Sequence, residues 1–477
     1  MRFDTVTFWL FFPVVWVLWR LLPFGAAKSL TLLASLGFYA WWKPQYVLLI
    51  FGSALVDYHV GARIFAASNR KMAKRWLVLS LCVNLGLLGV FKYAPFLLDN
   101  LGAWTGLFDA GRIRVLDGWV VPVGISFYTF QTLSYSLDIY RGQLKPCASF
   151  RDFFLYVSFF PQLVAGPIVR ASEFLPQLAK RTRLHGPMVQ IGIYRVLQGL
   201  FLKMVVADGI GRAVNRLYAP KAVAGLSAAE AWLGAIYFGA QIFADFAAYS
   251  GIAIGVAYLM GLRFPENFRY PYISQGLSEF WTRWHITLSQ WLRDYLYIPL
   301  GGNRQGPSRT KVNLLLTMLL GGLWHGAAWT YVAWGAMHGA GLIVERMLTG
   351  RRRSGADQAS GGFGGLALRC LRIGVTFAFV HTAWVFFRAP TFDVAWTMLG
   401  HMYVDPVRGS LGLDQLREWH SLVFVLPIAA LHGGQLLHEW LGLRKSPRRR
   451  AALAGVYLLG ITLFSRGEGV EFIYFQF

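Results

Sequence analysis

Three histidines in one stretch of the chain could carry acid–base or nucleophilic chemistry. His285, His325 and His338 all fall within residues 265–339. A neutral imidazole can take a proton from a hydroxyl group or attack an electrophile, because its unperturbed pKa is ~6.5. Neither an H-x-x-x-H pair nor a suitably spaced carboxylate accompanies these histidines, so we predict no bound metal.

His325 follows the apolar run 313–323 and has Gly322 and Gly326 close on either side. A helix from Val312 to His325 rises ~1.5 Å per residue, which carries the imidazole about 20 Å into a hydrocarbon core about 30 Å thick. An ionisable group at that depth is costly unless it is paired or faces a polar cavity, so it indicates a functional site. A histidine that hydrogen-bonds a neighbouring helix is the structural alternative.

His285 lies in a segment with the pattern of an amphipathic helix, residues 280–297. At 100° per residue, one arc of this helix is apolar and aromatic and its flank is basic, which suits a helix lying at the membrane interface. His285 falls at the edge of that arc, where an imidazole can be partly buried and still reach a polar cavity. An interfacial histidine that bonds a backbone carbonyl is the alternative. The arc contains Trp281, Trp284, Leu288, Trp291, Leu292 and Tyr295.

The elements that position these residues are predicted to be membrane helices. The chain is 56% hydrophobic and 14% charged, whereas a soluble domain is ~45–50% apolar and about 25% charged. Apolar segments recur along all 477 residues, and about 20 such residues cross a bilayer. We therefore predict an all-α polytopic membrane protein with roughly eleven to thirteen transmembrane or re-entrant helices. Residues 30–42 and 153–168 are the segments expected to be re-entrant or tilted.

The charge pattern predicts which loops face the cytoplasm. The net charge of +23 comes from basic residues in short loops between apolar segments, which follows the positive-inside rule and makes nucleic-acid binding the weaker interpretation. The stretch 388–420 mixes signs and is expected on the opposite side, and residues 350–365 are expected to form a flexible cytoplasmic linker. The loops predicted to be cytoplasmic are 70–75, 180–183, 351–353 and 444–450.

The residues around the histidines resemble the membrane-bound O-acyltransferase family, most closely its bacterial polysaccharide branch, which includes alginate O-acetyltransferases. The resemblance rests on residues 279–339 and on three further stretches, 122–131, 160–168 and 472–477. It spans most of the chain, and it implies a single domain over residues 1–477 whose helices form a ring around a central funnel, with residues 265–339 as the catalytic segment.

The resemblance also implies an activity and roles for the histidines. The chain is expected to be an O-acetyltransferase of the bacterial inner membrane, with catalytic residues His325 and His285. His325 would take the proton of an acceptor hydroxyl or form an acyl-imidazole, and His285 would orient the acceptor or donate to the oxyanion. His338 matches the same branch and is expected to bind substrate.

The substrates follow from the same comparison. Acetyl-CoA or a similar acyl donor would arrive from the cytoplasm, and no cofactor is expected to remain bound. The acceptor would be an exported polysaccharide, reached directly or through a periplasmic acetyltransferase partner. Arg293, Asn303 and Arg304 could hold the phosphates of the donor, although ordinary anchoring by positive charge also accounts for them.

One segment departs from the pattern of the branch, which usually reads Asp-Phe-Ser-Gly-Tyr-Ser-Asp after the eighth span. Residues 245–251 read Asp-Phe-Ala-Ala-Tyr-Ser-Gly, so the second acidic residue is absent. The departure leaves the reaction class intact but means that alginate is not implied as the acceptor.

Other functions remain open on the sequence. A D-alanyl transferase of the same family would act on teichoic acid and would need an aminoacyl carrier protein. A transporter or flippase of polysaccharide precursors predicts polar residues spread over many helices, whereas here they concentrate between Glu279 and Gly339. A scaffold for a polysaccharide synthase would leave the deep His325 without a role.

Overall fold

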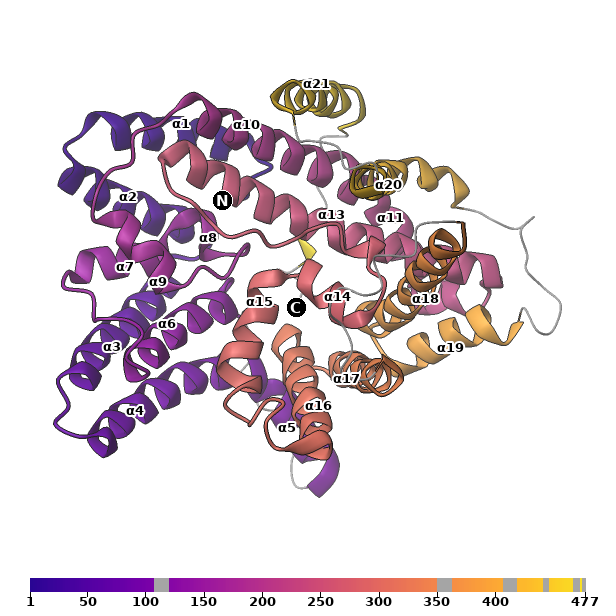
Figure 1. Cartoon of the computed structure of the whole chain (residues 1–477), viewed down its shortest axis with the longest axis horizontal. Helices are drawn as coiled ribbons and strands as arrows, with labels where there is room; N and C mark the ends of the chain where they lie inside the picture. The colour runs from indigo at the N-terminus through magenta and orange to yellow at the C-terminus, as the bar shows by residue number, and fades with distance from the viewer. Residues whose placement is uncertain (107–119, 350–362, 406–417, 441–445, 466–471, 474–477) are drawn as a thin grey trace. The chain divides into compact units, whose positions relative to one another are not determined.

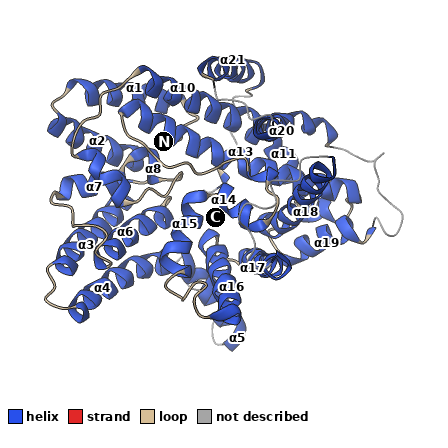
Figure 2. Cartoon of the chain, viewed as in Figure 1, coloured by secondary structure: helices blue, strands red, loops and turns tan. Residues whose placement is uncertain are grey.

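Helices account for all the regular secondary structure of the described residues, and no strand occurs among them (Figures 1 and 2). The computed structural model describes residues 1–106, 120–349, 363–405, 418–440, 446–465 and 472–473. Its contacts divide the chain into two compact units, Met1–Val196 with Tyr249–Pro265, and Leu197–Ala248 with Glu266–Phe477. The prediction of one domain over the whole chain stays a prediction.

The first unit is built mainly from helices of the N-terminal third. Helices α3, α4 and α6 pack side by side in it (Figure 1). Two long helices, α10 (Gly186–Phe201) and α13 (Ala228–Met260), are shared between the units. The helices wholly in this unit are α1 (Val6–Leu21), α2 (Phe24–Ala40), α3 (Val47–Phe65), α4 (Arg70–Leu88), α5 (Ala94–Thr105), α6 (Ile125–Tyr140), α7 (Phe150–Ser158), α8 (Phe160–Leu163) and α9 (Ala171–Phe174), with short η1 (Pro44–Tyr46), η2 (Gly89–Tyr93) and η5 (Leu175–Leu178).

The second unit contains all three histidines singled out by the sequence. In this unit α16 (Gly306–His325) and α17 (Trp329–Thr349) follow each other and form a helical hairpin. The other helices are η6 (Leu202–Ala207), α11 (Asp208–Leu217), α12 (Pro220–Val223), η7 (Pro271–Ile273), α14 (Leu277–Arg283), α15 (Ile286–Leu292), η8 (Arg293–Tyr297), α18 (Phe363–Arg388), α19 (Phe392–Tyr403), η12 (Trp419–Phe424), α20 (Leu426–Trp440) and α21 (Pro447–Phe464).

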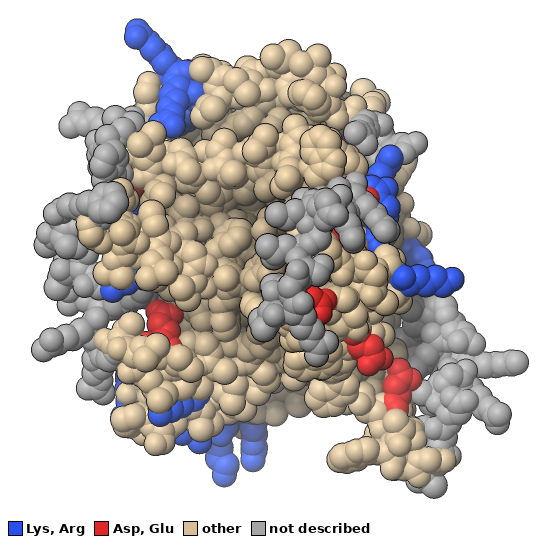
Figure 3. Space-filling model, turned by 90° about the vertical axis from the view of Figure 1, so that its right-hand side faces the viewer, with Lys and Arg blue, Asp and Glu red and all other residues tan. Residues whose placement is uncertain are grey.

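Five helical stretches of the described residues are long and apolar enough to cross a membrane. The chain is therefore a multi-pass helical membrane protein, and much of the face drawn in Figure 3 is free of charged side chains. The count of eleven to thirteen segments stays a prediction, because it includes shorter helices such as α1. The five stretches are Pro44–Phe65, Arg70–Thr105, Gly186–Leu217, Ala228–Met260 and Gly364–Arg388.

A buried polar cluster ties three of the apolar helices of the first unit together. The carboxylate of Asp57 on α3 is fully buried and accepts hydrogen bonds from Ser80 and Asn84 of α4 and from Ser136 of α6. Within the hydrocarbon core no water is present to accept hydrogen bonds from these donors. They therefore favour the one arrangement of the helices in which they reach the carboxylate.

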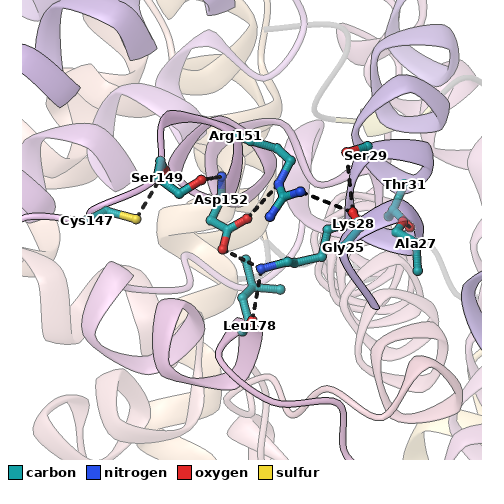
Figure 4. A network of polar contacts seen from close by, with 10 residues as sticks. All are labelled: Gly25, Ala27, Lys28, Ser29, Thr31, Cys147, Ser149, Arg151, Asp152 and Leu178. Carbon is teal, nitrogen blue, oxygen red and sulfur yellow. Dashed lines mark hydrogen bonds and ion pairs between the residues drawn. The ribbon is translucent and has the colours of Figure 1, made fainter. Parts of the chain in front are cut away.

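A second polar network joins α2 to α7 (Figure 4). The ammonium of Lys28 lies 2.5 Å from Asp152 Oδ2, and the same carboxylate accepts from Arg151 at 3.0 Å. Lys28 also donates to the carbonyl of Leu178. Because Lys28 is buried, pairing with a carboxylate is what offsets the loss of its hydration. The basic loop 180–183 is held by Arg181, which donates hydrogen bonds to two backbone carbonyls at the end of α1.

The expected continuous helix over residues 280–297 is wrong. Helix α14 ends at Arg283 and α15 begins at Ile286, with His285 between them at φ 40°. The neighbouring segment supplies backbone partners that replace those of a helix: Ile286 N donates to Asn267 O, and Arg269 N donates to Arg283 O, each at 2.9 Å. Tertiary hydrogen bonding therefore overrides the periodicity of the sequence at this point.

The hairpin of α16 and α17 depends on glycines where the two backbones meet. A Cβ atom on Gly322 would lie 2.3 Å from the carbonyl oxygen of Tyr331, and one on Gly335 would lie 2.4 Å from that of Met318. Close backbone approach between membrane helices requires small residues at the contact. Gly322, three residues before His325, thus serves helix packing.

Two further predictions concern segments outside regular helices. Residues 153–168, expected to be re-entrant or tilted, form a broken helix, with α7 ending at Ser158 and α8 covering Phe160–Leu163. The expected linker 350–365 lies outside the described residues up to position 362, and its last residues begin α18.

Candidate functional site

His285 is held in the break between α14 and α15, in a left-handed backbone conformation. Its side chain is fully buried, whereas the sequence pattern predicts a partly buried interfacial residue. The ring of Phe246 packs edge-on against the imidazole, with 4.6 Å between the ring centroids. Non-glycine residues in this conformation are uncommon and are often found at functional sites.

The amide of Asn267 identifies the protonated nitrogen of His285. The backbone N–H and the hydroxyl of Thr287 both donate to Asn267 Oδ1, at 3.3 and 2.9 Å. A backbone N–H can only donate, so this atom is the amide oxygen, and His285 Nδ1, at 3.1 Å from it, must be a donor as well. In the neutral ring, Nε2 then carries the lone pair, which can accept a proton or a hydrogen bond.

Burial keeps His285 neutral. It lies outside the membrane-spanning helices but has no exposed surface, and desolvation lowers the pKa of its imidazole to about 3. At neutral pH the ring is therefore a hydrogen-bond acceptor at Nε2 and not a cation.

His325 is the last residue of α16, and its ring is buried among aromatic side chains. Its centroid lies 5.2 Å from those of Trp334 and Phe387, and both rings stand at steep angles to it. The centroids of His325 and His285 are 6.4 Å apart. The structure therefore brings the two predicted catalytic histidines next to each other.

His338 lies on α17, on the other side of Trp334. Its ring centroid is 4.9 Å from that of Trp334 and 5.2 Å from that of Trp281. The side chain is fully buried, and neither ring nitrogen has a hydrogen-bond partner among the described residues. A buried polar group of this kind requires an explanation, such as a ligand or an ordered water.

Two kinds of residue in this region are not among the predicted site residues. One is Asn267, which fixes the tautomer of His285. The other is the set of rings that form the walls, of which Trp334 contacts both His325 and His338. Residues 265–271 belong to the predicted catalytic segment, but Asn267 stands there between Glu266 and Phe268 with no spacing that marks it as functional.

Asn303 and Arg304 lie at the opposite end of α16 from His325. Arg304 precedes α16 and His325 ends it, and the helix between them rises about 28 Å at 1.5 Å per residue. Arg293 pairs with Asp294 at 2.7 Å. Asn303 Oδ1 accepts from Tyr297 and from Arg346 of α17, so Arg346 is an additional cation beside the predicted three.

Two further buried histidines, His381 and His432, were not predicted as site residues, and their ring centroids lie 5.1 and 5.4 Å from that of Tyr272. The Nδ1–H of His381 donates to Phe377 O, and that of His432 donates to Ile428 O, each four residues earlier on the same helix. This bonding pattern suits a structural histidine, in contrast to that of His338.

Among the described residues, no group of three His, Cys, Asp or Glu side chains is arranged to hold a metal ion. The region instead combines a neutral imidazole whose Nε2 can accept, a second imidazole beside it, and aromatic walls. Such an arrangement can remove a proton from a hydroxyl group in a setting with little water.

Comparison with known proteins agrees with this chemistry. The sequence profile of the membrane-bound O-acyltransferase family matches residues 143–366. The probable alginate O-acetylase AlgI of Pseudomonas aeruginosa is 41% identical over 444 residues, which cover 93% of this chain and 81% of that protein. The peptidoglycan O-acetyltransferase of Helicobacter pylori is 35% identical over 420 residues, covering 82% of this chain and 75% of that protein.

A more distant relative carries a different activity. The teichoic acid D-alanyltransferase of Streptococcus thermophilus is 33% identical over 237 residues, which cover 46% of this chain and 56% of that protein. The similarity to the two acetylating proteins is therefore both higher and more extensive.

Proposed function

The chain belongs to the membrane-bound O-acyltransferase family, and from this premise we propose that it acetylates an exported polysaccharide of a bacterial envelope. As a multi-pass membrane acyltransferase, it would take the acetyl group from a cytoplasmic donor and deliver it across the inner membrane. The observation that carries the proposal is the pair His285–His325, buried together with 6.4 Å between their ring centroids.

His325 is the proposed general base. The acceptor hydroxyl gives its proton to the imidazole while its oxygen bonds to the acetyl carbonyl carbon, and the carbon–sulfur bond of the thioester then breaks. The thiolate leaves with the proton that His325 holds, so that the imidazole returns to its neutral form. An acyl-imidazole at His325 is the second route, and it divides the same transfer into two steps.

His285 is proposed to orient the acceptor. Of the two roles expected for it, donation to the oxyanion would require a proton on Nε2, and the low pKa of about 3 argues against that cation. Accepting a hydrogen bond at Nε2 from a second hydroxyl of the acceptor, next to the one that reacts at His325, fits the tautomer that Asn267 imposes. His338, with two ring nitrogens available among the described residues, would bind substrate on the other side of Trp334.

The donor is proposed to be acetyl-CoA or a similar long acyl carrier. The family implies an acyl donor but does not identify it. A donor that contacts both Arg304 and His325 must span about 28 Å, the rise of α16. Arg293, Asn303 and Arg304 would bind its phosphates at the cytoplasmic end of the helix, and Arg346 already contacts Asn303 there.

The acceptor is proposed as a polysaccharide hydroxyl, reached directly or through a periplasmic acetyltransferase partner. The names of the two acetylating relatives support a carbohydrate polymer of the cell envelope. D-alanyl transfer is the second candidate, on the strength of the D-alanyltransferase relative. A flippase without covalent chemistry would have no use for the buried base.

Replacing His325 with Ala tests the proposal. We expect ester-linked acetate on the exopolysaccharide to fall by roughly a hundred- to ten-thousandfold, the usual contribution of a general base. His432→Ala is the matched control, since it removes a buried histidine whose hydrogen bonding among the described residues is to a carbonyl of its own helix. Both variants are first checked for membrane insertion and amount.

Three results would contradict the proposal. Unchanged acetate in His325→Ala excludes His325 as the base. Loss of ester-linked D-alanine instead of acetate assigns the second candidate. A lower yield of polymer that still carries the usual amount of acetate per sugar indicates a role in export.

A further inference from the structure

Two segments of the second unit that are far apart in the sequence meet at a buried hydrogen bond. The backbone N–H of Ile473 donates to Asp245 Oδ2 at 2.7 Å, although the residues are 228 positions apart. Asp245 lies on α13, and Ile473 forms with Phe472 the described part of the C-terminal stretch 472–477, here called the C-terminal segment. Both residues are about 2% exposed.

The carboxylate that holds the C-terminal segment is itself held by a buried cation. The ammonium of Lys203, on the π-helix η6, lies 3.1 Å from Asp245 Oδ1 and 2.9 Å from Asp208 Oδ1. Two carboxylates thus share one ammonium, so the donor from Ile473 supplies further stabilisation to Asp245. Buried charges in membrane helices are expensive, which favours a functional reason for this group.

The next residue connects the cluster to the candidate site. Phe246 follows Asp245 and packs edge-on against His285, with the ring planes at 88° and the centroids 4.6 Å apart. The ring of Phe472, which is 3% exposed, lies 6.5 Å from that of Phe246. Phe246 therefore has contacts both with His285 and with the C-terminal segment.

We propose that Phe472 and Ile473 are positioning residues for acyl transfer, which hold Phe246 against the imidazole of His285. The Asp245–Ile473 hydrogen bond fixes the segment, Phe472 supports Phe246, and Phe246 keeps water from one side of His285. This inference rests on the proposed function, because it assigns His285 a part in the transfer. It also gives the Asp at position 245 a role that does not require the second acidic residue that is absent at Gly251.

Two variants separately remove the ring contact with Phe246 and the hydrogen bond to Asp245. Phe472→Ala deletes the supporting ring, and Ile473→Pro deletes the N–H that Asp245 accepts. Phe386→Ala controls for the first, because that ring is 4% exposed and packs against Phe392 and Trp396. Ile473→Val controls for the second, because it keeps the N–H and most of the apolar side chain.

The first readout is chemical and does not depend on activity. Full-length protein in proteoliposomes is treated with diethyl pyrocarbonate, which modifies neutral imidazoles that water reaches, and each histidine is followed by mass spectrometry. We expect His285 to be protected in the parent protein and to be labelled in Phe472→Ala and Ile473→Pro at a rate approaching that of the exposed His420. His338 should stay protected in every variant.

The second readout is kinetic, with radiolabelled acetyl-CoA as donor and unacetylated exopolysaccharide as acceptor. We expect kcat to fall roughly ten- to a hundredfold in both variants, with the KM for acetyl-CoA unchanged, because only the orientation of the acceptor is disturbed. Once water reaches His285, the pKa of its imidazole should rise toward the ordinary value of ~6.5. The pH profile of kcat should then show a loss of activity on its acid side.

The outcomes separate this inference from the proposed function. Protection of His285 and an unchanged kcat in both variants overturn the inference, whatever His325→Ala does. General labelling of buried histidines, or the same loss in the two control variants, shows that the segment only stabilises the fold and also overturns it. Activity that survives in His325→Ala overturns the proposed function while the labelling of His285 can still be measured.

Discussion

At the scale of single residues, Asn267 determines which nitrogen of His285 can meet a substrate. Its amide oxygen accepts from Thr287 twice and from His285 Nδ1. The imidazole therefore has a fixed tautomer and a fixed ring orientation before any substrate binds. Such preorganisation is what an orienting residue needs, since reorganisation during the reaction would raise the barrier.

Replacing Asn267 with Asp should change the pH profile. A carboxylate beside Nδ1–H favours the imidazolium, so it should raise the pKa of His285 from about 3. Since the neutral ring is the active form, activity at pH 5 should fall more than activity at pH 8. The measurement is the pH dependence of kcat in proteoliposomes.

Asn215→Asp is the control for that substitution. Asn215 accepts a hydrogen bond from Arg388 at 2.8 Å and is exposed, so an added carboxylate there leaves His285 unaffected. A profile of Asn267→Asp that coincides with that of the parent protein would refute the assigned tautomer and its importance.

The histidines were predictable from the sequence as candidates, whereas their partners were not. A histidine at the end of an apolar run such as 313–323 is unusual in itself, which singled out His325. Asn267 gains its importance from a backbone reversal that places it beside a residue 18 positions later. No local pattern encodes that approach. The proximity of His285 and His325 likewise depends on how three helices pack.

At the scale of elements, the main error was to expect one helix over residues 280–297. The aromatic periodicity favoured a single helix, but it does not register hydrogen bonds that come from outside the segment. Arg283 O and Ile286 N are both bonded to residues 267–269. A segment with competing backbone partners can leave the helix at little cost in hydrogen bonds, and the break is what buries His285.

The hairpin of α16 and α17 provides a test of packing at this scale. Gly335→Ala should destabilise the protein by about 1–3 kcal/mol, because its Cβ would lie 2.4 Å from Met318 O and the backbones would have to separate. Activity should fall with stability, since α16 carries His325 and α17 carries His338.

Gly374→Ala on α18 is the matched control for the hairpin. A Cβ atom there meets nothing within 4 Å, so the protein should be as stable as the parent or slightly more so. Thermal unfolding in detergent measures both variants. Equal melting temperatures for Gly335→Ala and Gly374→Ala would show that the hairpin can relax without cost.

At the scale of the whole molecule, composition was enough to predict a helical membrane protein. Charged residues make up 14% of the chain, which is too few to form the water-facing surface of a soluble protein of this length. The number of crossings was harder to predict, because helices such as α7 and α8 are short and broken. Hydropathy detects long apolar windows, and it cannot say whether two short helices together make one crossing.

The positive-inside pattern predicts opposite sides for two exposed loop positions. Ser68, between α3 and α4, should be cytoplasmic, and Pro390, between α18 and α19, should face the other side. After Cys82, Cys147 and Cys370 are replaced by Ser, a cysteine is introduced at one position at a time. A membrane-impermeant maleimide should label position 390 in intact spheroplasts and position 68 only in inverted vesicles. Labelling of both positions from the same side would refute the predicted topology.

The left-handed backbone of His285 limits which residues position 285 can accept. At φ 40°, Gly, Asn and Asp are tolerated, and β-branched residues such as Val, Ile or Thr are strongly disfavoured. Two independent constraints, one on the side chain and one on the main chain, therefore act on the same codon. In a saturation library the Asn and Gly replacements report the chemistry alone, whereas Val, Ile and Thr combine lost chemistry with a disrupted fold.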